Sequence, residues 1–159
     1  MGDEENKVLT KARNTAYRYL TYRPRSRAEI IQKLHDREFN QEIIEAVLAD
    51  LARFGYINDL QFADQWAQSR IRLRGFGRRR IEQELKNKGI DREIIQEVFG
   101  KLFVDGAEIE TAKLVAGKKI QTMKCVDRET RRRRLAGFLE RKGFSFEIIR
   151  TVLRDSDRN

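Results

Sequence analysis

Residues 40–54 read NQEIIEAVLADLARF, and their apolar side chains recur at the spacing of one helix face. The side chains on that face are Ile43, Ile44, Val47, Leu48, Leu51 and Phe54. Asn40 stands where an N-cap is expected, and Glu42 lies in the first turn, where the helix dipole favours an acid. The stretch therefore predicts an amphipathic helix with one buried face.

The same apolar pattern occurs twice more along the chain. Adding 51 to the first five numbers, and then a further 54, gives Ile94, Ile95, Val98, Phe99 and Leu102 after Asp91, and Ile148, Ile149, Val152 and Leu153 after Ser145. The helix before the stripe recurs with it. Its core pairs are Ile30 with Leu34, Ile81 with Leu85, and Leu135 with Leu139. Such periods indicate tandem structural units.

A third helix is expected at the start of each unit. The candidates are Val8–Tyr22, Leu60–Leu73 with a cap at Asn58 or Asp59, and Glu108–Gln121. The predicted fold is all-α, with three tandem three-helix repeats stacked into an elongated, curved molecule. We place the repeats at residues 8–57, 58–104 and 105–155. Each repeat is small, so we expect it to depend on its neighbours to cover its apolar face.

The composition limits the possible partners and compartments. The 159 residues include 34 Lys and Arg against 25 Asp and Glu, a net charge of +9, which favours a polyanion or an acidic protein surface as partner. No apolar run reaches the length of a membrane span, so no membrane partner is expected. The single cysteine, Cys125, cannot form an internal disulfide, which favours the reducing cytoplasm. We also expect a monomer.

Catalytic and metal-binding patterns are lacking. His35 is the one histidine and Cys125 the one cysteine, so neither a histidine triad nor a Cys/His zinc cluster can be assembled within the chain. Gly117 and Lys118 resemble the end of a phosphate-binding loop, but Ala112 and Lys119 occupy positions that need Gly and Ser or Thr. We therefore expect no enzyme, no cofactor and no metal.

Basic residues are the candidate binding groups. Between Ser69 and Ile81 there are six arginines and no acid, at positions Arg70, Arg72, Arg74, Arg78, Arg79 and Arg80. Such a concentration repels itself unless an external anion offsets it or water solvates it. A second basic concentration includes Lys118 and Lys119 and the run 131–134, and a solvated helix face remains an equal alternative for it.

The repeat also aligns some of these cations. Arg27, Arg78 and Arg132 occupy one position in the three units, near a helix N-terminus, where the dipole disfavours a cation. Helix stability does not explain them, so they are candidates for contact with a partner. Lys142 belongs to a set near the helix C-terminus, where the dipole favours a cation, and we interpret it as structural.

The middle of the chain resembles a known family. Residues 58–66 (NDLQFADQW), 77–81 (GRRRI) and 88–90 (KGI), preceded by 23–26 (RPRS) and 54–57 (FGYI), are similar to the signature of the RecX regulatory proteins. The resemblance runs from about Ala16 to Leu153, and the last unit matches mainly in its apolar pattern. It implies a protein that lies along the groove of the RecA filament on DNA. Filament extension, ATP hydrolysis, strand exchange and the coprotease function would then be inhibited.

Other functions are weighed against this one. A direct DNA-binding protein is the main alternative, because a three-helix unit with arginines at a helix start resembles helix-turn-helix architecture. Weak electrostatic binding of single- or double-stranded DNA is compatible with either function. An RNA-binding accessory has only the charge in its favour, and a hydrolase lacks a recognisable nucleophile and base.

Overall fold

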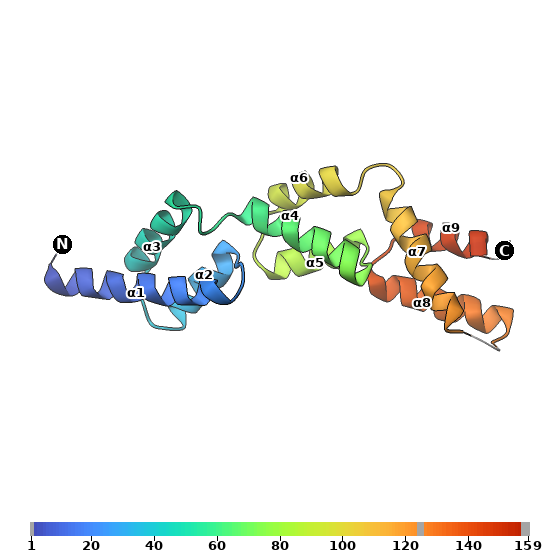
Figure 1. Cartoon of the computed structure of the whole chain (residues 1–159), viewed down its shortest axis with the longest axis horizontal. Helices are drawn as coiled ribbons and strands as arrows, with labels where there is room; N and C mark the ends of the chain where they lie inside the picture. The colour runs from blue at the N-terminus through green and yellow to red at the C-terminus, as the bar shows by residue number, and fades with distance from the viewer. Residues whose placement is uncertain (1, 124–125, 157–159) are drawn as a thin grey trace.

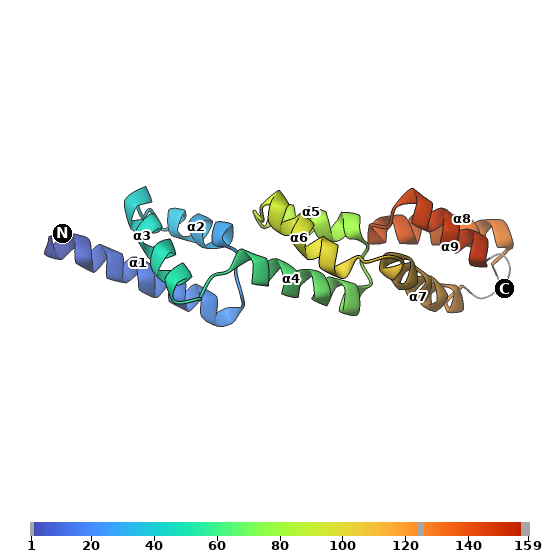
Figure 2. The same ribbon diagram turned by 90° about the horizontal axis from the view of Figure 1, so that it is seen from above.

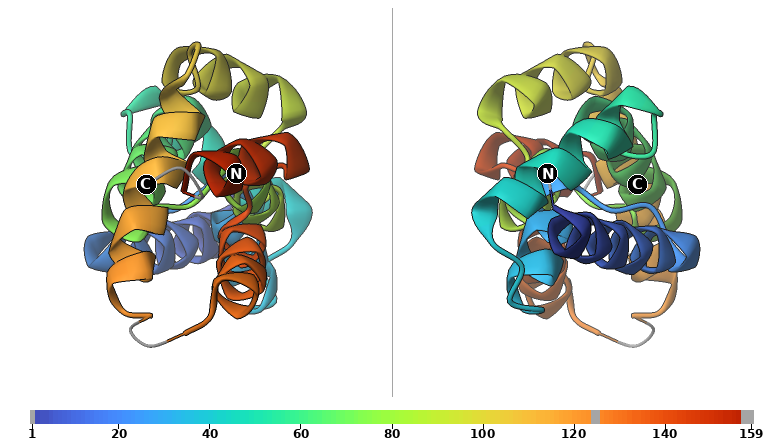
Figure 3. Two further views of the ribbon diagram at one scale, coloured as in Figure 1. Left: turned by 90° about the vertical axis from the view of Figure 1, so that its right-hand side faces the viewer. Right: turned by 90° about the vertical axis from the view of Figure 1, so that its left-hand side faces the viewer.

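The computed structural model describes residues 2–123 and 126–156, so Cys125 lies outside the described residues. Within them the chain forms nine α-helices and one π-helical turn. The helices make three groups in an elongated row, with the two termini at opposite ends (Figure 1; Figure 2, from above). Seen end-on, the three groups lie behind one another (Figure 3). The predicted all-α fold of three-helix units is confirmed.

Each unit is a sequence of three helices, and the middle unit carries the π-helical turn η1 in addition. In chain order the elements are α1 (Asp3–Tyr22), α2 (Arg27–His35), α3 (Gln41–Arg53), α4 (Asp59–Ser69), η1 (Arg70–Arg74), α5 (Arg78–Asn87), α6 (Arg92–Leu102), α7 (Ala107–Gln121), α8 (Arg128–Lys142) and α9 (Phe146–Ser156). The residue-level repeat boundaries at 57/58 and 104/105 stay a prediction.

Each unit buries its own apolar core. The stripe of α3 is buried as predicted from Ile43 to Leu51, whereas Phe54 is 61% exposed because the helix ends at Arg53. Three separate clusters of buried side chains form, one per unit. Among the described residues, helices pack closely only against helices of their own unit. The expectation that a unit needs its neighbours to cover its apolar face is therefore wrong.

The opening helices of the units share a register that the sequence pattern left open. Pairs of alanines four residues apart are at most 3% exposed in all three: Ala12 and Ala16, Ala63 and Ala67, and Ala112 and Ala116. Small side chains at this spacing bring the opening helix close to the two helices it covers. The repeated Ala-x-x-x-Ala spacing is a sequence signal that fixes this register.

Of the predicted N-cap residues, Asn40 and Asn58 form side-chain caps and Asp91 does not. The Asn40 side chain accepts a hydrogen bond from the Ile43 backbone N–H at 2.9 Å, as predicted. Asn58, and not Asp59, caps α4, since its Oδ1 accepts from the Gln61 N–H at 2.9 Å. Asp91 takes the N-cap position of α6 without a side-chain cap bond.

Polar joints connect the units. At the first joint, the N-terminus of α2 meets the C-terminus of α5, where the Ser26 hydroxyl donates to the Lys88 carbonyl at 2.6 Å. At the second joint, the N-terminus of α5 meets the C-terminus of α8, where the Gly77 N–H donates to the Lys142 carbonyl at 2.8 Å. Helices α2, α5 and α8 thus lie end to end (Figure 2), with positive and negative dipole ends in contact.

Candidate partner-binding surface

Two of the six arginines between Ser69 and Ile81, Arg70 and the exposed Arg80, are held by contacts within the protein. Arg70 Nε donates to Glu84 Oε2 at 2.6 Å, and its guanidinium lies 4.0 Å from the centre of the Trp66 ring. Arg80 stacks over Phe76 at 4.0 Å and donates to the Arg141 carbonyl at 2.8 Å. Both side chains therefore stabilise the middle unit or the second joint, although they were candidates for partner contact.

The other four arginines of this segment are exposed, as Arg80 is. Arg72 and Arg74 leave η1 toward solvent, and Arg78 and Arg79 open α5. Arg27 is also exposed and opens α2, one unit earlier. The structure thus places exposed arginines at the starts of two successive second helices, as the repeat predicts.

The backbone at these two helix starts is capped by acids of the next unit. The Arg27 N–H donates to Asp59 at 2.8 Å, and the Arg78 N–H donates to Glu108 at 2.8 Å. Burial raises the pKa of Asp59 and of Glu108, although these hydrogen bonds and the nearby arginines act in the opposite direction. Both joints therefore use a carboxylate to neutralise a helix N-terminus.

Arg132 does not occupy the predicted position at a helix start. Helix α8 begins at Arg128, one turn earlier than its counterparts, with Asp127 as the cap for the Thr130 N–H. Arg132 is thus an exposed residue inside the helix. The exact repeat spacing concealed this extra turn.

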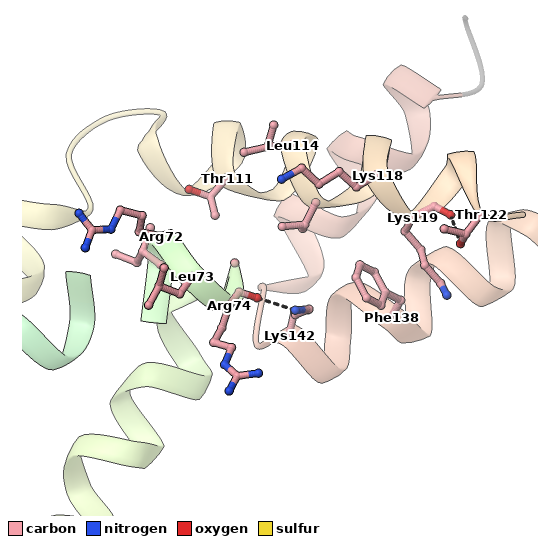
Figure 4. A pocket seen from close by; sticks show the side chains of 13 residues that line it. Arg72, Leu73, Arg74, Thr111, Leu114, Lys118, Lys119, Thr122, Phe138 and Lys142 are labelled. Atoms are coloured by element: carbon pink, nitrogen blue, oxygen red, sulfur yellow. Dashed lines mark hydrogen bonds between the residues drawn. The ribbon is translucent and has the colours of Figure 1, made fainter. Parts of the chain in front are cut away.

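A groove of about 340 Å³ lies at the second joint between η1, α7 and α8 (Figure 4). It brings together four predicted site residues, Arg72, Arg74, Lys118 and Lys119, from two regions of the sequence. Lys142, interpreted as structural from the sequence, completes the basic lining. In Figure 4 the guanidinium groups of Arg72 and Arg74 extend away from the centre of the groove, so their charges lie at its rim.

The groove combines these cations with apolar walls. Leu73 is 70% exposed and Leu114 is 61% exposed, and Phe138 lies deeper. Of the described residues that line the groove, none is an acid. Burial lowers the pKa of Lys142, and the nearby positive charges of Arg80 and Arg74 lower it further. A basic, partly apolar groove of this kind suits an anion that carries an apolar group.

The sequence analysis did not identify the apolar residues of the groove as part of a site. Leu73 was included in a predicted helix as an ordinary member, and Leu114 was assigned no role. A π-helical turn is often found at functional sites, and it changes which side chains a helix exposes. Lys142 has its Nζ bonded to the Arg74 carbonyl, a contact 68 residues away in sequence. No local pattern reports such a contact.

Among residues 2–123 and 126–156, no group of three or more His, Cys, Asp or Glu side chains is placed to hold a metal ion. In that same part of the chain, none of the helices has the length and apolar character needed to cross a membrane.

Comparison with known proteins supports the resemblance seen in the sequence. Three family models match in order: the RecX first three-helix domain at residues 12–51, the second at 58–98 and the third at 107–153. The chain belongs to the RecX family. It is 36% identical to the regulatory protein RecX of Streptomyces coelicolor, over 98% of this chain and 82% of that protein. It is 32% identical to the regulatory protein RecX of Clostridioides difficile, over 94% of this chain and 69% of that protein.

Solved RecX structures share the fold. The crystal structure of RecX from Lactobacillus salivarius matches with a TM-score of 0.85 and 25% identity, over 97% of this chain and 99% of that one. A second RecX crystal structure, 23% identical, matches the fold with a TM-score of 0.80. RecX relatives are named regulatory proteins, so the chain has a RecX regulatory role in the context of DNA repair and recombination.

Proposed function

We propose that this chain binds the RecA filament on DNA and inhibits filament extension, ATP hydrolysis, strand exchange and coprotease activity without catalysing a reaction. Membership of the RecX family supports this function. The structural observation that carries it is the row of units with exposed arginines at successive second helices, Arg27 in one unit and Arg78 and Arg79 in the next. We further propose that the protein acts in the cytoplasm as a monomer.

A row of similar units suits a partner that is itself repetitive. Each exposed arginine in water contributes little alone, because solvent and salt screen its charge. Several such contacts held on one scaffold add up, since the second contact forms at high effective concentration once the first is made. Arginine also grips phosphates or carboxylates with two parallel hydrogen bonds, which a filament of protein and DNA offers along its length.

The test measures single-strand-dependent ATP hydrolysis by RecA while the protein is titrated. The variant is Arg78→Gln with Arg79→Gln, and Arg80 is left intact because it holds the second joint. The matched control is Lys86→Gln with Lys101→Gln, which removes the same charge from residues paired with an acid of their own helix. We expect the arginine variant to need roughly tenfold more protein for half inhibition, and the control to match the wild type.

Two results would contradict the proposal. One is a wild-type protein that leaves ATP hydrolysis unchanged at any ratio to RecA. The other, which would contradict only the assignment of the site, is an arginine variant that inhibits as well as the control. Substoichiometric inhibition would indicate interference with filament extension, and its loss at higher salt would indicate that the exposed cations are involved.

Direct DNA binding is the second candidate function. It is favoured by the exposed arginines that begin α5 in a three-helix unit, an arrangement that resembles helix-turn-helix proteins. Lys118, Lys119 and Arg132 would then add phosphate contacts. Tight, sequence-selective binding of duplex DNA by the protein alone would favour this function, whereas weak, salt-sensitive binding is compatible with the first.

A further inference from the structure

The middle and third units can be superposed residue by residue from their buried side chains. Ala63 and Ala67 of α4 correspond to Ala112 and Ala116 of α7, and Ile81 and Leu85 of α5 to Leu135 and Leu139 of α8. The same offsets pair three further positions on or next to the first and second helices of the two units. Arg70 corresponds to Lys119, Lys88 to Lys142, and Glu84 to Phe138.

In the middle unit this position holds a carboxylate. Glu84 Oε2 accepts from Arg70 Nε at 2.6 Å and from the Trp66 indole N–H at 2.9 Å. Lys88 Nζ lies 4.6 Å from the centre of the same Trp66 ring. The carboxylate thus offsets the positive charge between α4 and α5, and the surface there is closed by its own side chains.

In the third unit both cations are kept and the carboxylate is replaced. Phe138 stands where Glu84 stood, with Lys119 Nζ 5.6 Å and Lys142 Nζ 5.5 Å from the centre of its ring. Neither lysine forms an ion pair with a carboxylate of the described residues. A ring face attracts a cation by about 0.5–1 kcal/mol at exposed sites, less than a hydrogen-bonded carboxylate does. The two lysines therefore lack the carboxylate partners that their counterparts have, which are Glu84 for Arg70 and Glu29 of the first unit for Lys88.

The surroundings of the lysines discriminate between kinds of anion. Aliphatic side chains, Leu73 and Leu114, stand exposed beside the charges. Binding of single-stranded nucleic acid relies on free aromatic faces for base stacking, but the one aromatic ring of the groove, Phe138, has lysines over it. Exposed leucines next to cations instead match a peptide in which an apolar side chain adjoins acids.

We propose that this groove binds an acidic peptide segment of a protein partner. A carboxylate of the peptide lies near Lys119 and Lys142, as Glu84 lies near Arg70 and Glu29 lies near Lys88. An adjacent apolar side chain of the peptide contacts Leu73 and Leu114. This inference deepens the proposed function, on which it rests for a protein as the partner. The test of peptide binding uses no recombinase, so the peptide-binding inference and the proposed function can be contradicted separately.

The experiment measures fluorescence anisotropy of a short labelled peptide of Asp, Glu and Gly residues around one central Leu. Competing probes are the same peptide with Asn and Gln for the acids, the same peptide with Ser for the Leu, and oligo-dT of equal charge. We expect Lys119→Gln to weaken binding of the acidic Leu peptide about tenfold and Leu114→Ser about threefold. Lys113→Gln, on the same helix but paired with Asp155, is the control and should bind as the wild type does.

A gain of an internal carboxylate provides an independent test. Phe138→Glu restores the residue found in the middle unit, so it should occupy the lysines from within and weaken peptide binding at least about tenfold. Circular dichroism and a melting curve check that the variant folds, and if it does not, Lys119→Gln and Leu114→Ser decide alone. Equal binding of the Asn and Gln peptide, wild-type affinity in the variants, or displacement by oligo-dT in preference to the acidic peptide would overturn the proposal.

Discussion

The two joints between units are built from the same helix ends but differ in their charge balance. At the first joint Glu29 is surrounded by Arg23 at 2.6 Å, Lys88 at 3.1 Å and Arg25 at 3.8 Å. Burial alone would raise the pKa of Glu29, but hydrogen bonds from Arg23, the Ser26 N–H and Lys88 outweigh it and lower the pKa to about 2. Positive charge at this joint is thus offset by the protein itself.

The second joint has cations at the corresponding place. Lys142 donates to the Arg74 carbonyl and Arg80 to the Arg141 carbonyl, so both side chains are held by backbone dipoles. The pKa of Lys142 is lowered by burial and by Arg80 and Arg74. The same contact between a helix N-terminus and a helix C-terminus therefore has a different charge balance at each joint. The first joint is balanced for stability, and the second leaves positive charge available beside a groove.

The largest expected effect comes from Gly143→Ala at the second joint. Gly143 has φ of 90° and lies against Arg80, whose backbone N would be 2.5 Å from an added Cβ. The backbone strain and the overlap should together lower the free energy of unfolding by about 3 kcal/mol, measured by urea denaturation. The control is Gly100→Ala in α6, where an added Cβ meets nothing within 4 Å, and it should stabilise by about 0.5–1 kcal/mol. Equal stability of the two variants would contradict the close approach at the second joint.

Neutralising the first joint should have the next largest effect. The pKa of Glu29 falls from 4.5 to about 2 on folding, so its stabilising contribution is complete above pH 4.5 and is lost as the pH falls toward 2. After allowance for solvent screening, Glu29→Gln should lower the free energy of unfolding at pH 7 by about 1–2 kcal/mol. The difference between variant and wild type should shrink as the pH falls from 4.5 to 2 and should vanish below pH 2. A difference that is constant with pH would exclude this electrostatic origin.

Glu38→Gly should have a smaller effect, of opposite sign. Glu38 ends α2 with φ of 61°, as Gly89 and Gly143 end α5 and α8 in left-handed conformations. Those glycines also lie against Ala28 and Arg80 of a preceding unit. Glu38 is exposed and carries a side chain in the same strained backbone conformation. Relief of that strain should stabilise by about 0.5–1 kcal/mol in urea denaturation, and a destabilised variant would contradict it.

The smallest expected effect is a pH dependence at Lys142. Its pKa is lower in the folded protein than the ordinary value of 10.5, so folding disfavours its charged form. The penalty is present below the lowered pKa and is relieved as the pH rises toward 10.5. Wild-type protein should therefore gain stability relative to Lys142→Gln over the alkaline range, as the pH rises toward 10.5. A difference in melting temperature between the two proteins that stays constant over that range would contradict a lowered pKa for Lys142.

The helices and their threefold repetition could be predicted because the buried face of a helix appears in the sequence as a regular spacing of apolar residues. The 3.6-residue spacing from Ile43 to Leu51 and the matching pairs such as Ile81 with Leu85 need no distant partner to be recognised. The separation of the cores could not be predicted in this way. Helical spacing shows which face is buried, but it does not show whether a helix of the same unit or of a neighbour covers that face.

The division of the arginines depends on distant contacts. Arg70 turns inward because it bonds Glu84 and stacks on Trp66, whereas Arg72, within the π-helical turn, is exposed. The groove itself requires Lys142 to meet the carbonyl of Arg74, which is 68 residues away in the sequence. The sequence pattern locates the cationic segments, but it does not show which of their members bond within the protein; their role in binding stays a prediction.

The separate cores have a mechanical consequence. Bending the molecule between two units would disturb the hydrogen bonds of the joints, the ion pair of Lys88 with Glu29, and the close approach of Gly77 to Phe144, but it would leave the three apolar cores intact. Stiff segments are thus linked by compliant hinges. A rod of this kind follows the pitch of a long helical assembly by small rotations at each hinge, while every segment keeps its internal packing.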